Sequence, residues 1–274
     1  MFLKRILKKT SPKLYKGLKL ANSNISFSGW GMTLTTTNNP WEKTNSKIHN
    51  YFNSLNKNLL SLVEKGKFKL NQFKANDKKK MKKVEELSWR HYLLFMLAIF
   101  AVKKTKIKKK VFVECGVSDG LTSYFIINAI NKFTSNYFCF LFDSWSVMKN
   151  VSKKKEEEKM VGSFDKININ DTKLNLKRYT NKINFIKGLI PDSFKNQNRI
   201  KNITMLHIDL NSALATEKSL NFFFKKIVSN GIIVFDDYGW KDFELTKILV
   251  DKFLRNKDGL FLQLPTGQGV FIKK

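Results

Sequence analysis

The chain has 274 residues, 42% of them hydrophobic and 13% aromatic, which is enough to bury one sizeable core and excludes a disordered protein. Lysine and arginine outnumber aspartate and glutamate by 51 to 22, for a formal net charge of +29. Such a charge favours anionic partners, but nearly all of the excess is lysine rather than the arginine that nucleic-acid readers prefer.

The first residues, 1–20, place apolar side chains among lysines at helical spacing. They predict a basic helix docked on the body, with a weak contact to a membrane surface as the alternative. There is no apolar stretch typical of a signal peptide, and the apolar run at 92–102 is too short to cross a bilayer. Cys115 and Cys139 form no CxxC pair. We therefore expect a cytoplasmic protein, with peripheral membrane attachment left open.

The N-terminal part differs in composition from the rest. Residues 21–41 are rich in Ser, Thr, Asn and Gly, which predicts an irregular segment. Two helices are expected next, over 45–65 and 82–102. We therefore expect a helical and irregular region over residues 1–105, which would cover a substrate, and a second domain over residues 106–274.

The second domain begins a new pattern of short apolar runs alternating with helical segments. The runs are 111–116, 137–143, 183–188, 204–210 and 231–238. The helices are expected at 121–133, 153–165, 174–181, 216–229 and 243–256. This alternation predicts βαβ units and a parallel sheet with helices on both faces.

The end of the chain breaks this pattern. The stretch LFLQLPTGQGVFIKK contains two apolar runs separated by TGQG. A glycine-bearing connection of this length forms a hairpin. The last strand should therefore run antiparallel, as an edge strand added to the parallel sheet.

Carboxylates stand at the ends of four apolar runs: Glu114, Asp143, Asp209, and Asp236 with Asp237. In open parallel sheets, ligands bind beyond the carboxyl ends of the strands. Four such strand ends with acidic residues therefore indicate one shared site. Asp143 follows the second run, where a carboxylate accepts hydrogen bonds from ribose hydroxyls.

The glycine pattern after the first run narrows the choice of cofactor. A dinucleotide needs G-x-G-x-x-G to bring backbone amides against its pyrophosphate. Here Gly116 and Gly120 are separated by three residues that include Asp119. Asp119 would place a negative charge beside a pyrophosphate, so an adenosyl cofactor without phosphates fits better.

Seven blocks in this order resemble class I S-adenosylmethionine-dependent methyltransferases, in particular the macrocin O-methyltransferase family. The blocks are WRHYLLF, FVECGVSDG, FDSW, GLIPDSF, LHIDLN, FDDYG and LPTGQGVFIK. They span about two thirds of the chain. The resemblance implies a Rossmann-like α/β fold with a seven-stranded, mainly parallel sheet, an inserted antiparallel last strand, helices on both faces and a helical N-terminal region.

The resemblance also implies the residues that hold the cofactor, S-adenosylmethionine: Glu114, Gly116, Ser118, Gly120, Asp143, Ser144, Trp145 and Gly188. The first four would form the turn that cradles the methionine part, and Asp143 would hold the ribose hydroxyls. Ser144 and Trp145 would lie near the adenine, with Gly188 at its edge.

A divalent metal, usually magnesium, is implied at three carboxylates: Asp209, Asp236 and Asp237. Such an ion would acidify a bound substrate hydroxyl, which then attacks the sulfonium methyl. Two positions depart from the family's pattern, since Asn211 replaces a second acid and Gly239 replaces the histidine that serves as base. The catalytic base is therefore left open among three residues: Asp209, Asp237 and His91.

The expected function is a metal-assisted O-methyltransferase that acts on a hydroxyl of a sugar or another small or glycan acceptor. One alternative is a methyltransferase of RNA, prompted by the net charge. The DLNSA block lacks the prolines found in enzymes that methylate exocyclic base nitrogens, so no specific nucleic acid is expected. A catalytically inactive, basic binding module of the same fold is another alternative, and a homo-oligomer remains open.

Overall fold

The computed structural model describes residues 25–27, 32–34, 46–73, 76–151 and 153–274. The chain forms two compact units, 1–51 and 52–274. In the first unit, β1 (Ile25–Phe27) and β2 (Met32–Leu34) pair antiparallel, within a segment expected to be irregular. The basic helix expected over residues 1–20 lies outside the described residues. The functional division at residue 105 stays a prediction.

Three helices precede the sheet: α3 (Lys47–Glu64), α4 (Asp77–Glu86) and α5 (Ser88–Lys104). The helix expected over 45–65 is confirmed. The helix expected over 82–102 is divided between α4 and α5, because the backbone leaves helical geometry at Leu87 (φ −93, ψ 2). The apolar pattern of the sequence therefore did not predict the interruption at Leu87 between α4 and α5.

The sheet of the second unit has seven strands: β3 (Lys110–Cys115), β4 (Tyr137–Asp143), β5 (Ile183–Lys187), β6 (Ile203–Ile208), β7 (Ile227–Phe235), β8 (Gly259–Gln263) and β9 (Gly269–Lys273). Their order is β5-β4-β3-β6-β7-β9-β8. β3 to β7 pair in parallel, whereas β9 is antiparallel to both of its neighbours. The expected Rossmann-like fold, with an antiparallel last strand, is confirmed.

The expectation that the last strand forms the edge of the sheet is wrong. β9 is inserted between β7 and β8, and β8 forms the edge. Burial explains the order, because Val270 and Phe271 on β9 are 1% and 2% exposed while Leu260 on β8 is 55% exposed. A strand with apolar residues on both faces is stabilised inside a sheet rather than at its edge.

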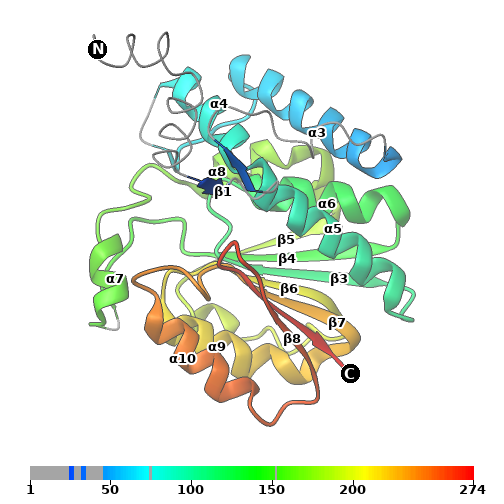
Figure 1. Cartoon of the computed structure of the whole chain (residues 1–274), viewed down its shortest axis with the longest axis vertical. Coiled ribbons are helices and arrows are strands. Elements are labelled where there is room, and N and C mark those ends of the chain that lie inside the picture. The colour runs from blue at the N-terminus through cyan, green and yellow to red at the C-terminus, as the bar shows by residue number, and fades with distance from the viewer. Residues whose placement is uncertain (1–24, 28–31, 35–45, 74–75, 152) are drawn as a thin grey trace, which may run out of the picture. The chain divides into compact units, whose positions relative to one another are not determined.

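Helices cover both faces of this sheet (Figure 1). α5 packs with α6 (Leu121–Phe133) on one face, and α9 (Ala213–Phe223) packs with α10 (Glu244–Leu254) on the other. Two shorter helices, α7 (Lys155–Met160) and α8 (Ile169–Asn175), lie in the connections. The α-helix expected at 174–181 is wrong, because α8 ends at Asn175 and a 3-10 helix covers Lys177–Lys182. The helix expected at 216–229 ends earlier, at Phe223, and β7 begins at Ile227.

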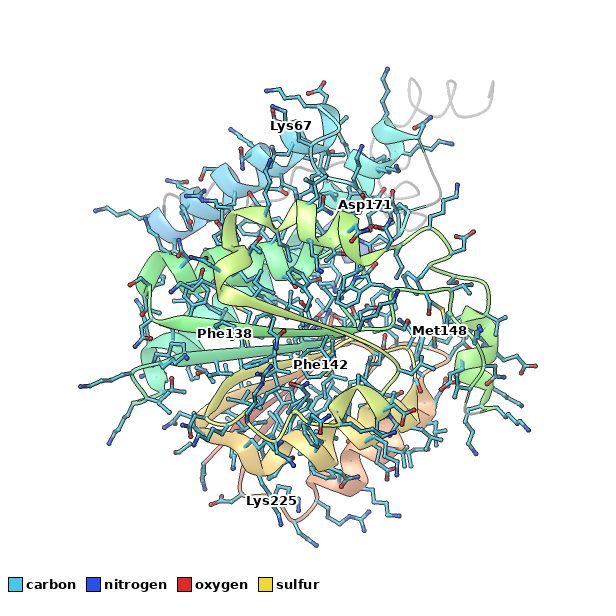
Figure 2. All side chains as sticks on the ribbon, turned by 180° about the vertical axis from the view of Figure 1, so that it is seen from behind. Lys67, Phe138, Phe142, Met148, Asp171 and Lys225 are labelled. Atoms are coloured by element: carbon cyan, nitrogen blue, oxygen red, sulfur yellow. The ribbon has the colours of Figure 1, made fainter. Side chains whose placement is uncertain are left out.

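An aromatic cluster joins the sheet to α9. The rings of Phe142, Phe194 and Phe223 lie with centroids 5.0 to 5.6 Å apart, and all three side chains are buried. Figure 2 shows Phe142 at the centre of the molecule, while Lys67 and Lys225 lie at the surface. Within the described part of the chain, no helix has the length and hydrophobicity needed to cross a membrane.

Candidate active site

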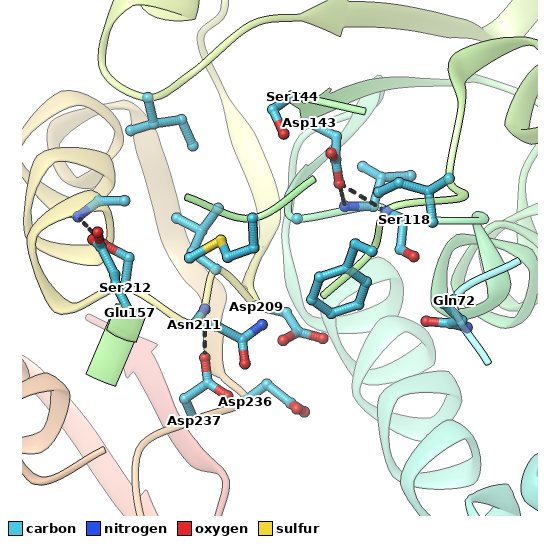
Figure 3. A pocket seen from close by; sticks show the side chains of 18 of the residues that line it. Gln72, Ser118, Asp143, Ser144, Glu157, Asp209, Asn211, Ser212, Asp236 and Asp237 are labelled. Carbon is cyan, nitrogen blue, oxygen red and sulfur yellow. Dashed lines mark hydrogen bonds between the residues drawn. The ribbon is translucent and has the colours of Figure 1, made fainter. Parts of the chain in front are cut away.

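A cavity of about 700 Å³ opens at the carboxyl edge of the sheet. The parallel strands β3, β4, β6 and β7 all end at this edge, so the residues that follow them converge. Eight residues singled out in the sequence line the cavity: Gly116, Ser118, Asp143, Ser144, Gly188, Asp209, Asp236 and Asp237 (Figure 3). Three of the four acidic strand ends expected to share a site therefore do so, at Asp143, at Asp209 and at the pair Asp236 and Asp237, whereas Glu114 does not line the cavity.

Gly116 begins the turn after β3 and touches the end of β6. Its φ is +89, and a Cβ atom at this position would lie only 1.7 Å from the carbonyl oxygen of Asp209. An L side chain would therefore be strained by its backbone conformation and blocked by its neighbour. The glycine lets the turn and the end of β6 share one wall of the cavity.

Asp143 holds the same turn by accepting hydrogen bonds from backbone amides. Its Oδ2 accepts from the amides of Val117 at 2.7 Å and Ser118 at 2.8 Å, and its Oδ1 accepts from Trp145 at 2.7 Å. Burial raises the pKa of Asp143, and these amides partly oppose the rise. The Ser144 amide also lowers the pKa, so backbone amides take up most of the about four acceptor positions of this carboxylate, and a ligand hydroxyl would share an oxygen with them.

Glu114 and Gly120 do not line the cavity. Glu114 is fully buried behind the turn, where it accepts a hydrogen bond from the Ser123 hydroxyl and lies 2.9 Å from Nδ1 of His207. Burial by itself lowers the pKa of His207, but the hydrogen bond and charge of Glu114 outweigh this effect and raise it. Gly120, at φ +78, starts α6. Both residues support the turn from behind.

Trp145 also lies away from the cavity. It is 3% exposed, and its indole Nε1 donates to the Ser118 carbonyl and to the Thr172 hydroxyl, both at 3.0 Å. It therefore braces the turn, whereas the adjacent Ser144 lines the cavity.

His91 is fully buried and stacks on Phe125, with ring centroids 4.7 Å apart. Neither ring nitrogen has a hydrogen-bond partner. Burial, together with the positive charges of Arg90 and His207, lowers the pKa of His91 well below its ordinary value. The structure places this neutral ring in the core and not among the cavity-lining residues.

Asp119 turns away from the cavity, contrary to the expectation that it faces the cofactor. Ser118, at φ 51, reverses the backbone just before it. The Asp119 side chain is fully buried and accepts a hydrogen bond from the Gln72 amide at 2.7 Å. Desolvation raises its pKa to about 7, with a smaller contribution from the charge of Asp171 and opposition from backbone hydrogen bonds.

The acid cluster, defined as Asp209, Asp236 and Asp237, lies at the ends of β6 and β7. Arg90, from the first turn of α5, pairs with two of its members. Its Nη2 donates to Asp209 Oδ2 at 2.5 Å, and its Nε donates to Asp236 Oδ1 at 2.8 Å. Sequence reasoning missed this residue, although an arginine in a largely apolar helix signals an internal partner.

The charges of this cluster shift the pKa of each member. Burial would lower the pKa of Arg90, but Asp236 and Asp209 outweigh burial and raise it. Burial and the charge of Asp236 raise the pKa of Asp209 to about 6, although the positive charge of Arg90 opposes the rise. Burial would raise the pKa of Asp236, but Arg90 lowers it overall. Burial and the two neighbouring carboxylates raise the pKa of Asp237 well above its ordinary value.

Gln268 completes the cluster from the TGQG hairpin. Its side chain is fully buried, and its Nε2 donates to Asp236 Oδ1 at 3.3 Å. At position 239, two residues after the acid pair, a Cβ atom would lie 3.1 Å from the Gly267 carbonyl oxygen, so a side chain there would press on the hairpin backbone. The hairpin therefore occupies the space beside the cluster.

The acid cluster fits the expected magnesium ion poorly. Ligand atoms of His207, Asp209 and Asp236, not of Asp237, come within 4.8 Å of one another among the described residues. Arg90 already binds one oxygen of each of these two carboxylates. A doubly charged ion would compete with the guanidinium for these carboxylate oxygens and would be repelled by its charge.

Comparison with known proteins supports the interpretation of the fold. Residues 113–238 match the family described as "Methyltransferase domain". The structure resembles the O-methyltransferase NovP, with a TM-score of 0.62 and 13% identity, over 83% of this chain and 100% of that one. It also resembles CalS11, a calicheamicin methyltransferase, with a TM-score of 0.56 and 12% identity, over 84% and 94% of the two chains. No curated protein matches. The match thus covers a methyltransferase domain within this chain, and the two solved structures share its fold.

Proposed function

We propose that this protein is an S-adenosylmethionine-dependent O-methyltransferase that acts on a hydroxyl of a small, sugar-like acceptor. One observation carries the proposal: a single cavity has the glycine turn with Asp143 in one wall and the acid cluster in another. The first wall suits an adenosyl donor, and the second suits an acceptor that loses a proton.

The donor would lie along the ends of β3 and β4. Gly116 has no side chain that would obstruct the methionine part, and the Asp143 carboxylate lines the cavity where it would accept hydrogen bonds from the ribose hydroxyls. Gly188 follows β5 and lines the same cavity, together with Leu189 and Ile190. These neighbours provide an apolar surface for the adenine, near which Trp145 was expected to lie.

Asp237 is the proposed proton acceptor. Arg90 pairs with the other two carboxylates, whereas Asp237 makes no ion pair within the described residues and accepts a hydrogen bond from the Asn211 amide at 2.9 Å. Its raised pKa narrows the difference from the pKa of a hydroxyl, which favours proton transfer.

The reaction conserves atoms and charge. A lone pair of the acceptor oxygen forms the new O–CH₃ bond while the S–CH₃ bond breaks in line. The sulfonium becomes the neutral thioether of S-adenosylhomocysteine, and the hydroxyl proton passes to Asp237. The methyl group is already activated, so alignment by the cavity walls is the main contribution of the protein, worth several kcal/mol.

The acceptor side of the cavity suits a sugar ring. Trp240 and Phe243 line it, and Trp240 is 47% exposed. Aromatic faces pack against the C–H surfaces of sugars, and carboxylates accept hydrogen bonds from their hydroxyls. The name of NovP as an O-methyltransferase supports oxygen as the methyl acceptor.

A second candidate is an RNA methyltransferase, favoured by the net charge of +29. Two exposed lysines, Lys149 and Lys218, line the same cavity. They would contact the phosphates of a nucleic acid or a phosphate group on a small acceptor.

Calorimetric titration with S-adenosylmethionine tests the donor half. We expect binding by the native protein, loss of binding in Asp143→Ala, and unchanged binding in Asp258→Ala, which removes an exposed carboxylate. Transfer of a labelled methyl group is then measured with hydroxylated glycosides and with RNA. Absence of cofactor binding would refute the proposal, and transfer to RNA alone would favour the second candidate.

A further inference from the structure

We propose that Arg90 takes the place of a divalent cation in the acid cluster, so that methyl transfer by this protein needs no metal ion. The inference rests on the proposed function for its activity readout only. The arrangement of the charged groups can be tested on the protein without an acceptor.

The position of Arg90 is the first argument. Ile208 and Phe235 are paired in the sheet, so the residues that follow them, Asp209 and Asp236, are neighbours. The guanidinium binds one oxygen of each carboxylate, at 2.5 and 2.8 Å. An ion that bridges neighbouring carboxylates would need this same location.

The burial of the three side chains is the second argument. The exposed fractions are 13% for Arg90, 23% for Asp209 and 10% for Asp236. A partly desolvated arginine between two desolvated carboxylates forms a mutually stabilised set, and removal of one partner leaves an unpaired buried charge. Arg90 therefore has no comparable alternative position when an ion arrives.

The remaining ligands are the third argument. Asp237 accepts a backbone hydrogen bond from Asn211, and its ligand atoms lie outside the converging group. Asn211 also supplies no second acid. His207 contributes the third converging atom, and its Nε2 is buried without a hydrogen-bond partner. This set of one histidine and two arginine-bound carboxylates is unlike the oxygen-rich set that magnesium prefers.

Arg90 also has a structural consequence that a free ion would not have. It belongs to α5, 119 residues before Asp209 and 146 before Asp236 in the sequence. Its two ion pairs hold the start of α5 against the carboxyl edge of the sheet, where Arg90 and Leu87 line the cavity. Arg90 is therefore a positioning residue that both offsets the charge of Asp209 and Asp236 and lines the cavity.

Electron paramagnetic resonance with Mn²⁺ tests the inference on the native, chelator-treated protein. We expect no bound Mn²⁺ at millimolar concentrations. In Arg90→Gln the gap between the carboxylates becomes vacant, and we expect Mn²⁺ to bind there. The double variant Arg90→Gln with Asp236→Asn should lose the bound ion again. Arg178→Gln, a surface change, should behave like the native protein.

Activity provides the second readout. We expect methyl transfer by the native protein to be unchanged by a chelator and by added magnesium. Binding of Mn²⁺ to the native protein, or loss of activity with a chelator and recovery with a metal, would overturn the inference. So would Ni²⁺ or Co²⁺ binding that disappears in His207→Gln, because this would identify a metal site beside Arg90. Failure of cofactor binding would instead refute the proposed function.

Discussion

The two walls of the cavity are built in different ways. The donor wall is local, since Asp143 fixes the turn after β3 through the amides of Val117 and Ser118. The acceptor wall is assembled from distant parts of the chain, because its carboxylates at β6 and β7 depend on Arg90 of α5 and Gln268 of the last hairpin. Local motifs therefore identify the donor wall, whereas the acceptor wall depends on the fold.

The largest expected effect comes from breaking the junction of the two walls. In Gly116→Ala the new Cβ would lie 1.7 Å from the Asp209 carbonyl, and we expect a loss of more than about 4 kcal/mol of unfolding free energy. Urea unfolding measures the loss. Gly162→Ala is the matched control, because Gly162 also has a positive φ but no neighbour within 4 Å, and should cost only about 1 kcal/mol. Equal losses in the two variants would contradict the close approach.

The second prediction separates the walls by kinetics. Asp237→Asn removes the proposed proton acceptor, and we expect kcat to fall about 10²- to 10⁴-fold while the Kd for S-adenosylmethionine stays unchanged. In Asp143→Asn, by contrast, we expect the main effect to be a higher Kd for S-adenosylmethionine. Because the base acts only when deprotonated, activity should fall as pH drops through the raised pKa of Asp237. A Kd that rises equally in both variants would contradict two separate walls.

The third prediction concerns the stability of the donor turn. The pKa of Asp119 is raised from 3.8 to about 7, so the folded state keeps a proton that the unfolded chain has lost. Stability should therefore fall as pH rises from about 4 to about 7, by up to roughly 4 kcal/mol, and level off above. Asp119→Asn should remove the part of the slope that this proton contributes, measured by urea unfolding across the range, while the raised pKa values of Asp143, Asp209 and Asp237 keep the rest. Asp258→Asn should keep the slope, and an unchanged slope in Asp119→Asn would contradict the buried acid.

The smallest expected effect comes from substitutions of two tryptophans, Trp145 and Trp240. Trp145→Phe removes the indole donor to the Ser118 carbonyl and the Thr172 hydroxyl. We expect the binding free energy of S-adenosylmethionine to weaken by about 1 kcal/mol, which corresponds to about a fivefold higher Kd. Trp240→Phe, on the acceptor side, should leave this affinity unchanged and raise the KM for the acceptor. The reverse pattern would exchange the roles of the two residues.

Much of the donor wall could be predicted from the sequence. The strand ends at Cys115 and Asp143 and the glycine at Gly116 are local features, and local apolar periodicity locates them. The direction of the neighbouring side chains was not predictable to the same degree. A backbone reversal at Ser118 turns Asp119 away from the cavity, and the same turn covers Trp145.

The acceptor wall was predictable only in part. Asp209 and Asp236 are strand-terminal acids and were identified, but their partner Arg90 is 119 and 146 residues away. Local patterns carry no information about contacts over such separations. The hairpin pattern alone placed β9 wrongly at the edge, because its burial on both faces depends on which strands flank it, whereas the family resemblance implied the inserted position.

The contact between Gly116 and the Asp209 carbonyl has a dynamic consequence. Thermal motion that shifts the turn also shifts the backbone bearing Asp209, because the Asp209 amide donates to the Cys115 carbonyl at 2.9 Å and no side chain separates Gly116 from the Asp209 carbonyl. Fluctuations of the donor and of the acceptor are thereby correlated. The reacting distance is then less variable than the motion of either segment alone.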